Sequence, residues 1–318
     1  MNAASTTTVD VLSQALKAAG DDLRLQVLAL LAQDSYAVQE LCQIFASKQS
    51  GMSHHLKVLN KAQLVSTRRE GNTNYYRRSD EACSQALDHL RDSIYQAADA
   101  LHLSDEVQAQ LGTLYQQRAA ASLAFFKDNA AAFKEQQDLI AAYDVYGPEV
   151  ASLLGRGLKA LEVGPGNGEF LSELAARFEQ VIALDTSAQM LEQSKELCSK
   201  QNIDNVNFVN GDTAHCRALA NSLDAIVINM VLHHTPSPAT IFADVSSALK
   251  PGAMLLVCEL GAHDQDWVKQ ACGDQWLGFA SSELKQWAKL QALTEGASRY
   301  FALRNGFQIQ IHQFFKQH

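Results

Sequence analysis

One stretch of the chain, Ala160 to Phe170, constrains the fold more than any other. It reads Ala-Leu-Glu-Val-Gly-Pro-Gly-Asn-Gly-Glu-Phe. Its apolar start predicts a short buried strand, and its end predicts the first turn of a helix. Between them, Gly164, Gly166 and Gly168 allow a ligand to come closer to the backbone than side chains would permit. The stretch therefore predicts a strand, a ligand-binding turn and a helix.

A carboxylate stands where a bound nucleoside would need one. The apolar run Val181–Leu184 predicts a second buried strand, and Asp185 follows it, seventeen positions after Gly168. An acidic side chain at the end of this strand can accept hydrogen bonds from both hydroxyls of a ribose. We therefore expect a ligand that contains a nucleoside, bound across the ends of these two strands.

From residue 159 onward, strand patterns alternate with helical patterns. The expected strands are residues 159–163, 181–184, 206–209, 225–229 and 254–260, and the expected helices are residues 170–178, 188–200 and 239–249. This alternation predicts a doubly wound α/β domain with a mostly parallel sheet. Parallel strands place their carboxyl ends at one edge, so the glycine turn, Asp185, Asp212 and Asn229 should meet there.

The C-terminal residues predict an antiparallel end to this sheet. Residues 282–292 have an amphipathic helical pattern, and residues 298–303 and 307–315 alternate in polarity around Arg304-Asn305-Gly306. Alternating runs on both sides of an Asn-Gly turn predict a β-hairpin. With the parallel strands, the hairpin makes a mostly parallel seven-stranded sheet, which argues against a plain dinucleotide-binding fold.

The first hundred residues carry a different pattern, of short helices. Apolar spacing predicts helices over residues 9–19 and 23–32, and Ser35 is placed to cap a third helix through Cys42. A fourth helix, residues 48–60, follows a tight turn and has a polar outer face, as in a helix-turn-helix. Its candidate DNA contacts are Lys48, Gln49, Ser50, Ser53, His54 and Lys57.

A basic hairpin pattern follows these helices. The strand-like runs 64–69 and 73–78 flank Glu70-Gly71-Asn72, a sequence typical of a tight turn. Residues 47–78 contain seven Lys and Arg against one Glu, a local charge of +6, whereas the whole chain carries −9. A compact basic region in an acidic chain predicts local contact with a polyanion. Its candidate DNA contacts are Arg68, Arg69, Asn72 and Arg77.

Residues 53–59, 62–65, 68–72 and 75–76 resemble the winged-helix repressors of the ArsR family almost segment for segment. The resemblance covers about residues 9–103. It implies a homodimer that binds double-stranded DNA at a palindromic operator, with the first helix and the helix after the hairpin in the dimer interface. That later helix has an apolar stripe at helical spacing: Ala86, Leu90, Ile94, Ala97 and Leu101.

Many ArsR-family relatives sense metal ions, but their ligand patterns are missing from this sequence. Where some relatives have a Cys-x-Cys pair, this chain has Cys42 and Ile44. Asp88, His89 and His102 do not have the spacing that other relatives use on the last helix. Because one thiolate cannot form a thiophilic site, we expect no bound metal.

The glycine turn and Glu162 resemble the first motif of class I S-adenosylmethionine-dependent methyltransferases, and Lys250-Pro251-Gly252-Ala253 matches the turn before their fifth strand. The resemblance covers about residues 115–318 and implies S-adenosylmethionine or S-adenosylhomocysteine as the ligand. It implies that Asp185 holds the ribose, that Asp212 accepts from the adenine amino group and that Asn229 lies near the methionine part. The full set of implied ligand-binding residues is Glu162, Gly164, Gly166, Gly168, Asp185, Thr186, Met190, Asp212, Thr213 and Asn229.

No catalytic motif can be recognised beside this pocket, so the catalytic residues are unknown. The Asn-Pro-Pro-Tyr type of motif that acts on nucleobases is absent, and Asn229-Met230-Val231-Leu232 stands in its place. The cysteines expected of arsenite methyltransferases are absent too. Side chains near the strand ends that could serve as a base are His233, His234, Cys258, Glu259, His263 and Asp264.

The patterns divide the chain into three parts. We expect a DNA-binding and dimerisation domain over residues 1–103, a helical linker or lid over 104–150, and the ligand-binding domain over 151–318. The middle part would brace the domains or cover the pocket with Tyr115, Arg118 or Phe126. No apolar run approaches the ~20 residues of a membrane span. Met1–Thr8 lacks signal-peptide features, and six cysteines without metal-like spacing favour reduced thiols in the cytoplasm.

Two functions from different classes follow from these patterns. In the first, the methyltransferase-like domain is a receptor for S-adenosylhomocysteine or S-adenosylmethionine, and the winged helix represses transcription. Resemblance to ArsR-family regulators fused to such a domain implies control of methionine and S-adenosylmethionine recycling genes. In the second, the chain is an active small-molecule methyltransferase with a fused, autoregulatory DNA-binding domain. The missing acceptor motif favours the first. The sequence leaves open which of the two ligands is the signal. It also leaves open whether that ligand weakens or strengthens DNA binding.

Overall fold

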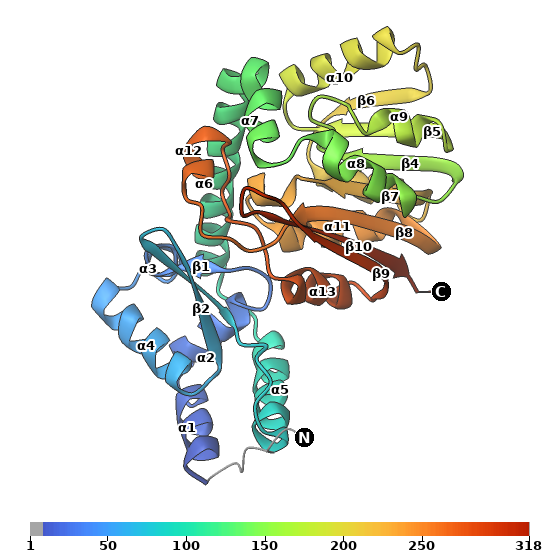
Figure 1. Ribbon diagram of the computed structural model, residues 1–318. Helices are drawn as coiled ribbons and strands as arrows, with labels where there is room; N and C mark the ends of the chain where they lie inside the picture. Colours follow the sequence, from blue (N-terminus) through green and yellow to red (C-terminus); the bar gives the residue numbers. More distant parts are fainter. Residues whose placement is uncertain (1–8, 318) are drawn as a thin grey trace. The chain divides into compact units, whose positions relative to one another are not determined.

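The structure is a computed structural model that describes residues 9–317, so the expected lack of a signal peptide at Met1–Thr8 lies outside the described residues. The chain forms two compact units, Met1–Gln117 and Arg118–His318 (Figure 1). Their boundary falls inside one long helix, α6 (Asp105–Asn129). The expected linker, residues 104–150, is therefore largely helical and is shared between the two units.

In the first unit, short helices surround a small sheet. The helices are α1 (Val9–Ala19), α2 (Asp22–Leu30), α3 (Val38–Ile44), α4 (Gln49–Lys61) and α5 (Gln85–Asp99). Three side chains of α4, Met52, Leu56 and Leu59, are fully buried in the core of this unit. The helix-turn-helix of α3 and α4 therefore rests on an apolar stripe at helical spacing, opposite the predicted polar face.

The hairpin of the first unit belongs to a three-stranded antiparallel sheet with the order β1-β3-β2, in which β1 is Tyr36–Ala37. Strands β2 (Val65–Glu70) and β3 (Thr73–Arg78) pair up to Glu70 and Thr73, so Gly71 and Asn72 form the turn. Gly71 has a φ of 54°, which this tight turn requires. The predicted hairpin is confirmed.

The prediction that Ser35 caps α3 is wrong. The capping position is Ala37, whose backbone N–H donates to the side chain of Glu40. Tyr36 and Ala37 form the short strand β1, which pairs with β3. Tyr36 is buried, so packing of its ring favours an extended backbone where local spacing suggested the start of a helix.

The second unit is built on one seven-stranded sheet with the order β6-β5-β4-β7-β8-β10-β9. The first five strands in this order run parallel, and β10 runs antiparallel to β8 and β9. The strands are β4 (Gly157–Val163), β5 (Phe178–Asp185), β6 (Val206–Asn210), β7 (Leu223–Asn229), β8 (Leu249–Leu260), β9 (Leu293–Ala302) and β10 (Gln308–Lys316). The predicted doubly wound, mostly parallel sheet is confirmed.

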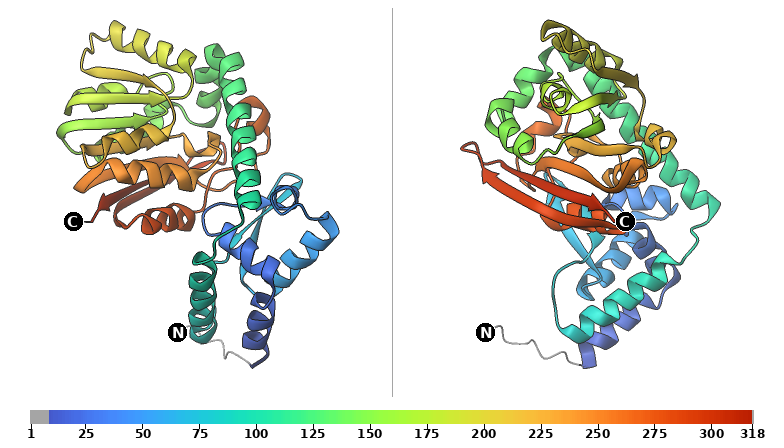
Figure 2. Two further views of the ribbon diagram at one scale, coloured as in Figure 1. Left: turned by 180° about the vertical axis from the view of Figure 1, so that it is seen from behind. Right: turned by 90° about the vertical axis from the view of Figure 1, so that its right-hand side faces the viewer.

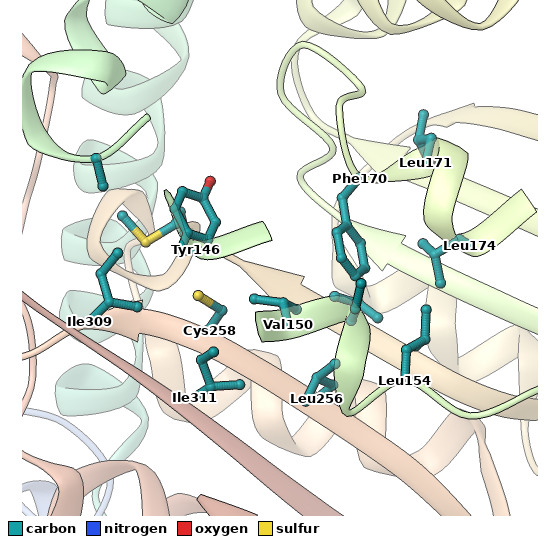
Figure 3. Packing of buried hydrophobic residues seen from close by; sticks show 14 of the residues in the cluster. Tyr146, Val150, Leu154, Phe170, Leu171, Leu174, Leu256, Cys258, Ile309 and Ile311 are labelled. Carbon is teal, nitrogen blue, oxygen red and sulfur yellow. The ribbon is translucent and has the colours of Figure 1, made fainter. Parts of the chain in front are cut away.

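Helices cover both faces of this sheet. In Figure 2 the sheet can be followed from the edge strand β6, in yellow, to the other edge strand β9, in dark red. One face is covered by α8 (Tyr143–Ser152), α9 (Leu171–Ala175) and α10 (Ala188–Lys200), the other by α11 (Pro238–Ala248) and α13 (Ser281–Leu290). Val150 of α8, Phe170 before α9 and Cys258 of β8 belong to one buried cluster (Figure 3). The remaining elements are η1 (Ala130–Ala132), α7 (Phe133–Ile140), η2 (Thr213–Leu219), η3 (Leu232–His234) and α12 (Trp267–Ala271).

Several predicted boundaries are wrong: β8 and β9 each begin five residues before the expected positions 254 and 298, and the helix expected over residues 170–178 ends too late. Helix α9 ends at Ala175, and Phe178 begins β5, where it pairs with Gly157. Phe178 is buried in the core, so tertiary packing decides its conformation. Among residues 9–317, no helix has both the length and the apolar character needed to cross a membrane. All six cysteines have free thiols.

Candidate functional site

The carboxyl ends of three neighbouring strands lie level with one another in the second unit. Val163 at the end of β4 pairs with Leu184 of β5 on one side and with Ile228 of β7 on the other. The next residue of each strand therefore lies at the same edge of the sheet; these residues are Gly164, Asp185 and Asn229. The structure thus brings the predicted strand-end residues together, as a doubly wound sheet does at its ligand edge.

The three glycines of the turn after β4 have different surroundings. Gly164, Gly166 and Gly168 all have positive φ, at 62°, 56° and 84°. A Cβ on Gly164 or Gly168 would lie within 3.0 Å of other protein atoms, so packing requires glycine there. A Cβ on Gly166 would come near the ring of Phe133, at 3.6 Å. At Gly166 a Cβ would make only an ordinary contact, so here the positive φ favours glycine and packing does not require it.

Two buried oxygen atoms beside this turn lack a hydrogen-bond partner in the described part of the chain. They are Oε2 of Glu162 and Oδ1 of Asn229. Burial, together with the negative charge of Asp185, raises the pKa of Glu162 to about 8. A buried acceptor without a partner costs about 1–3 kcal/mol. A ligand with N–H donors would relieve this cost, so the two side chains fit an amino group.

Asp185 is held in place at the end of β5. Its Oδ1 accepts a hydrogen bond from the backbone N–H of Ser187 at 2.8 Å. Burial raises the pKa of Asp185 to about 6, although the N–H groups of Ser187 and Thr186 act in the opposite direction. The backbone after β5 thus fixes the carboxylate at the strand end, where it can also accept from a ligand.

Asp212 and Thr213 follow β6, and they differ in whether their side chains can still contact a ligand. Asp212 is exposed, and its Oδ1 accepts from the N–H of Ala214. The hydroxyl of Thr213 donates to Asp244 at 2.8 Å, and Nε of Arg217 donates to the other oxygen of Asp244. The sequence did not single out Asp244. Its contacts show that the Thr213 hydroxyl is engaged by the protein itself.

An aromatic cover lies beside the glycine turn. Phe126 of α6 and Phe133 of α7 have ring centroids 5.0 Å apart, and both pack with Met190. Lys134 donates to Oε1 of Glu169 at 2.5 Å, which ties α7 to the segment that follows the glycines. The sequence proposed Phe126 as a cover residue but missed Phe133, because its spacing is that of any buried helical residue.

The other two proposed cover residues have different surroundings. The hydroxyl of Tyr115 donates to Asp34 at 2.8 Å and lies 2.5 Å from the hydroxyl of Tyr36. Arg118 donates to the carbonyl of Pro236 at 2.9 Å. Tyr115 and Arg118 are thus one turn apart on α6, but Tyr115 is held by residues of the first unit and Arg118 by a residue of the second.

A fully buried histidine and glutamate lie where β7 and β8 end. Nδ1 of His233 is 2.5 Å from Oε1 of Glu259. Burial alone would lower the pKa of His233, but the charges of Glu259 and Asp274 outweigh it and raise the pKa to about 9. Within residues 9–317, Nε2 of His233 has no hydrogen-bond partner.

His234 and Asp274 adjoin this pair. Nδ1 of His234 is 3.7 Å from Oδ1 of Asp274, and Nε2 is 3.2 Å from the side-chain nitrogen of Gln137. Burial, followed by repulsion from His233, keeps the pKa of His234 well below its usual range. Asp274 was missed in the sequence because forty residues separate it from His234 and no local spacing links them.

The remaining candidate bases have other roles or surroundings. Cys258 is fully buried in the sheet, and burial raises the pKa of its thiol well above the usual range. His263 packs edge-on against Phe307 at 4.8 Å. Asp264 is exposed. The structure therefore brings together His233, His234 and Glu259 and leaves the other three candidates apart from any recognisable base arrangement.

In the first unit, the outer face of α4 is exposed. The exposed side chains are those proposed to contact DNA: Lys48, Gln49, Ser50, Ser53, His54 and Lys57. The neighbouring His55 is half-buried, and its Nδ1 lies 3.6 Å from Asp21. Of the two adjacent histidines, His54 thus faces outward and His55 packs against α2.

The arginines of the hairpin fall into two groups. Arg69 is exposed near the tip, beside the exposed Asn72. Arg68 and Arg77 form ion pairs, with Glu70 at 2.6 Å and Asp80 at 3.2 Å. All three arginines were proposed as phosphate contacts, and Arg69 has the side chain most accessible to a phosphate.

Two family models match the chain. Residues 21–67 match the model for bacterial regulatory proteins of the arsR family, and residues 161–257 match the model for a methyltransferase domain. The first match covers α2 to β2 and thus the helix-turn-helix. The second covers β4 to β8 and thus the glycine turn, Asp185 and Asp212.

Curated relatives are similar to the second unit. A tRNA 5-carboxymethoxyuridine methyltransferase of Escherichia coli K12 is 31% identical over 113 residues, which are 33% of this chain and 41% of that protein. An arsenite methyltransferase of Halobacterium salinarum is 24% identical over 161 residues, 49% of this chain and 38% of that protein. The chain spans less than half the length of these relatives.

A solved structure has the same fold as the second unit. It is the 1,6-didemethyltoxoflavin-N1-methyltransferase of Burkholderia thailandensis with bound 1,6-didemethyltoxoflavin and S-adenosylhomocysteine. The TM-score is 0.52 at 17% identity, over 64% of this chain and 91% of that chain. The chain therefore combines an arsR-family helix-turn-helix domain with a domain of the class I methyltransferase fold.

Proposed function

We propose that the chain is a transcriptional repressor whose methyltransferase-like domain senses S-adenosylhomocysteine or S-adenosylmethionine and controls genes of methionine and S-adenosylmethionine recycling. The observation that carries the proposal is the continuity of α6 across the two units. Tyr115 is held in the DNA-binding unit, and Arg118, one turn later, is held in the ligand-binding unit. A ligand that alters how the second unit holds α6 would act on the same helix in the first.

The pocket has the polar groups that an S-adenosyl nucleoside requires. Asp185 offers a carboxylate oxygen to the ribose hydroxyls, and the exposed Asp212 can accept from the adenine amino group. Glu162 and Asn229 supply buried acceptors for the amino group of the methionine part. The Burkholderia thailandensis structure of the same fold contains S-adenosylhomocysteine, which supports this class of ligand.

A homodimer of this chain would use α1 and α5, as the ArsR resemblance implies. On α1, Val9 is 84% exposed and Leu16 is 57% exposed, and Leu101, just after α5, is 41% exposed. These apolar side chains are poorly covered within one chain, and a partner copy would cover them. Two copies of α4 would then enter successive major grooves of a palindromic operator, ~34 Å apart.

The exposed residues of the first unit would make two kinds of contact with such DNA. The polar side chains of α4 would contact base edges: Gln49, Ser50, Ser53 and His54. The cations around them would hold phosphates and make the affinity salt-dependent: Lys48, Lys57 and Arg69. Action on chromosomal DNA would place the protein in the cytoplasm, as the sequence predicted.

The contacts of α6 suggest how ligand and DNA would be coupled. In the first unit, Tyr115 touches Tyr36 of β1, which pairs with Tyr76 of the hairpin strand β3. In the second unit, the carbonyl of Arg118 accepts from Gln275, which also donates to the carbonyl of His234. Couplings between sites are typically ~1–3 kcal/mol, about 5- to 150-fold in affinity. Ligand binding would therefore change DNA affinity by a factor in this range.

A second candidate function is methyl transfer to a small molecule, and the His233–Glu259 pair favours it. S-adenosylmethionine would supply the methyl group, and Nε2 of His233 would accept the proton of the acceptor. Two observations weaken this candidate. His233 is fully buried, and a pKa of about 9 keeps its ring protonated at neutral pH, where a base must be neutral.

Isothermal titration calorimetry of the full-length protein with each nucleoside tests the ligand assignment. We expect one site per chain, and Asp185→Ala should weaken binding by at least about tenfold, because hydrogen bonds to a charged group contribute about 1.5–3 kcal/mol. Asp204→Ala, which changes an exposed aspartate before β6, is the matched control and should bind as the unchanged chain does. If neither nucleoside binds, the receptor proposal is wrong. Turnover of S-adenosylmethionine with a small acceptor would favour the second candidate.

A further inference from the structure

Three buried side chains that can ligate metals converge where β7 and β8 end. His233, His234 and Asp274 each place one ligand atom within 4.8 Å of the ligand atoms of the other two. All three residues are buried. Ligands about 2 Å from a shared ion lie roughly 3–4 Å apart, so the three atoms would have to approach by about 1 Å. Two imidazoles and one carboxylate form a ligand set that zinc and other divalent transition metals use.

Glu259 determines which nitrogen of His233 is available. Its carboxylate accepts from Nδ1 of His233 at 2.5 Å, from the backbone N–H of His233 at 3.3 Å and from that of Leu260 at 2.6 Å. A neutral imidazole that donates from Nδ1 has its lone pair on Nε2. Metal-binding histidines are commonly oriented by a carboxylate in this way. Nε2 has no hydrogen-bond partner within residues 9–317, although His233 is fully buried.

Gln137 can orient His234 in the same manner. The side-chain amide of Gln137 lies 3.2 Å from Nε2 of His234. In the orientation that points its oxygen at this ring, Gln137 accepts from Nε2–H, and the lone pair of His234 then lies on Nδ1. That Nδ1 lies 3.7 Å from Oδ1 of Asp274.

The charges at this place favour a cation. The carboxylates of Glu259 and Asp274 are both fully buried. Buried carboxylates are stable only beside positive charge or strong donors. A divalent ion bound to neutral imidazoles would supply two positive charges and balance both carboxylates.

We infer that His233, His234 and Asp274 form a binding site for a divalent transition-metal ion such as Zn²⁺, with Glu259 and Gln137 orienting the two rings. All five residues belong to the second unit, so the site does not involve Cys42 of the first unit. None of them is among the predicted nucleoside-binding residues, so the inference does not depend on the proposed function. The ring of Phe133 adjoins both places, since it contacts His234 and lies beside Gly166.

Cobalt spectroscopy of the full-length, chelator-treated protein tests the site. Co²⁺ bound by imidazole and carboxylate ligands absorbs visible light, and Zn²⁺ displaces it without absorbing. We expect one Co²⁺ per chain, displaced by one Zn²⁺. Asp274→Asn and His234→Gln should each remove the absorption band, and Gln137→Ala should weaken binding about 10- to 100-fold.

Two control variants test whether the metal binds elsewhere. His89→Gln changes an exposed histidine of α5, and Cys42→Ser removes a half-buried thiol of α3; both should keep the full band. Thermal unfolding checks the fold of every variant, and Zn²⁺ should raise the Tm of the unchanged chain but not that of His234→Gln. If Asp274→Asn does not fold, His234→Gln and Gln137→Ala decide. Less than one metal per chain, or a band that survives His234→Gln, would overturn the inference.

Discussion

Glu162 is buried beside Asp185 with one oxygen lacking a partner among the described residues, and burial raises its pKa from 4.5 to about 8. Between pH 4.5 and about pH 8, the folded state therefore keeps a proton on Glu162 that the unfolded state releases. It follows that stability falls as the pH rises from 4.5 to 8. One pKa unit corresponds to about 1.4 kcal/mol, so this effect amounts to at most about 5 kcal/mol.

Glu162→Gln should remove that pH dependence, because glutamine stays neutral. We expect the variant to have a higher Tm than the unchanged chain at pH 9 and nearly the same Tm at pH 5, as measured by thermal unfolding without ligand. Glu179→Gln, at an exposed position of β5, is the matched control and should not show this difference. An equal Tm difference at both pH values would contradict the assignment of the raised pKa.

The residues of the candidate site could be predicted to the extent that each has a local sequence signature. Gly166 and Asp185 follow apolar strands at short, fixed spacings, so the sequence alone could place them at one sheet edge. Asp274, Asp244 and Phe133 act through tertiary contacts with residues far away in sequence. No spacing rule reveals such contacts, and they were found in the structure.

At the level of elements, the hairpin of the first unit should contribute phosphate contacts through Arg69. Arg69→Ala should weaken DNA binding for every sequence and lower the slope of log affinity against log salt by about 0.9, the value for one phosphate contact. Fluorescence anisotropy over a salt series measures this slope. Arg156→Ala, an exposed arginine of the second unit, is the control. An unchanged slope in Arg69→Ala would exclude this side chain from phosphate contact.

Helix α6 should transmit the ligand signal through Tyr115. Tyr115→Phe removes the hydroxyl that contacts Asp34 and Tyr36, which should destabilise the first unit by about 1 kcal/mol. We expect DNA affinity and ligand affinity measured separately to change less than about twofold, while the effect of ligand on DNA affinity largely disappears. Tyr300→Phe, which removes a half-exposed hydroxyl of β9, should respond normally. Undiminished coupling in Tyr115→Phe would contradict this role of α6.

Elements with a long periodic pattern were predicted well. Helices α1 and α10 have the predicted bounds, and α4 differs by one residue at each end, because their apolar residues repeat over several turns. The short strand β1 and the early end of α9 were not predicted. Both depend on pairing with strands distant in sequence, which overrides the local pattern over a few residues.

For the whole molecule, the proposed dimer makes a distinct prediction. Leu16→Glu places a charge on the exposed apolar face of α1, where it would be buried against a partner chain. We expect a shift from dimer to monomer by light scattering after gel filtration and a loss of operator affinity. Leu158→Glu, at a similarly exposed leucine of β4, is the control and should stay dimeric. A dimeric Leu16→Glu would place the interface elsewhere.

In the proposed function, one ligand couples the two units. The most direct measurement is fluorescence anisotropy of the full-length protein on DNA from upstream of its own gene, with S-adenosylhomocysteine and S-adenosylmethionine titrated separately at fixed salt. We expect at least one of them to change DNA affinity about fivefold or more, in either direction. If both bind the protein and neither changes its affinity for DNA, the two units are uncoupled and the receptor function is contradicted.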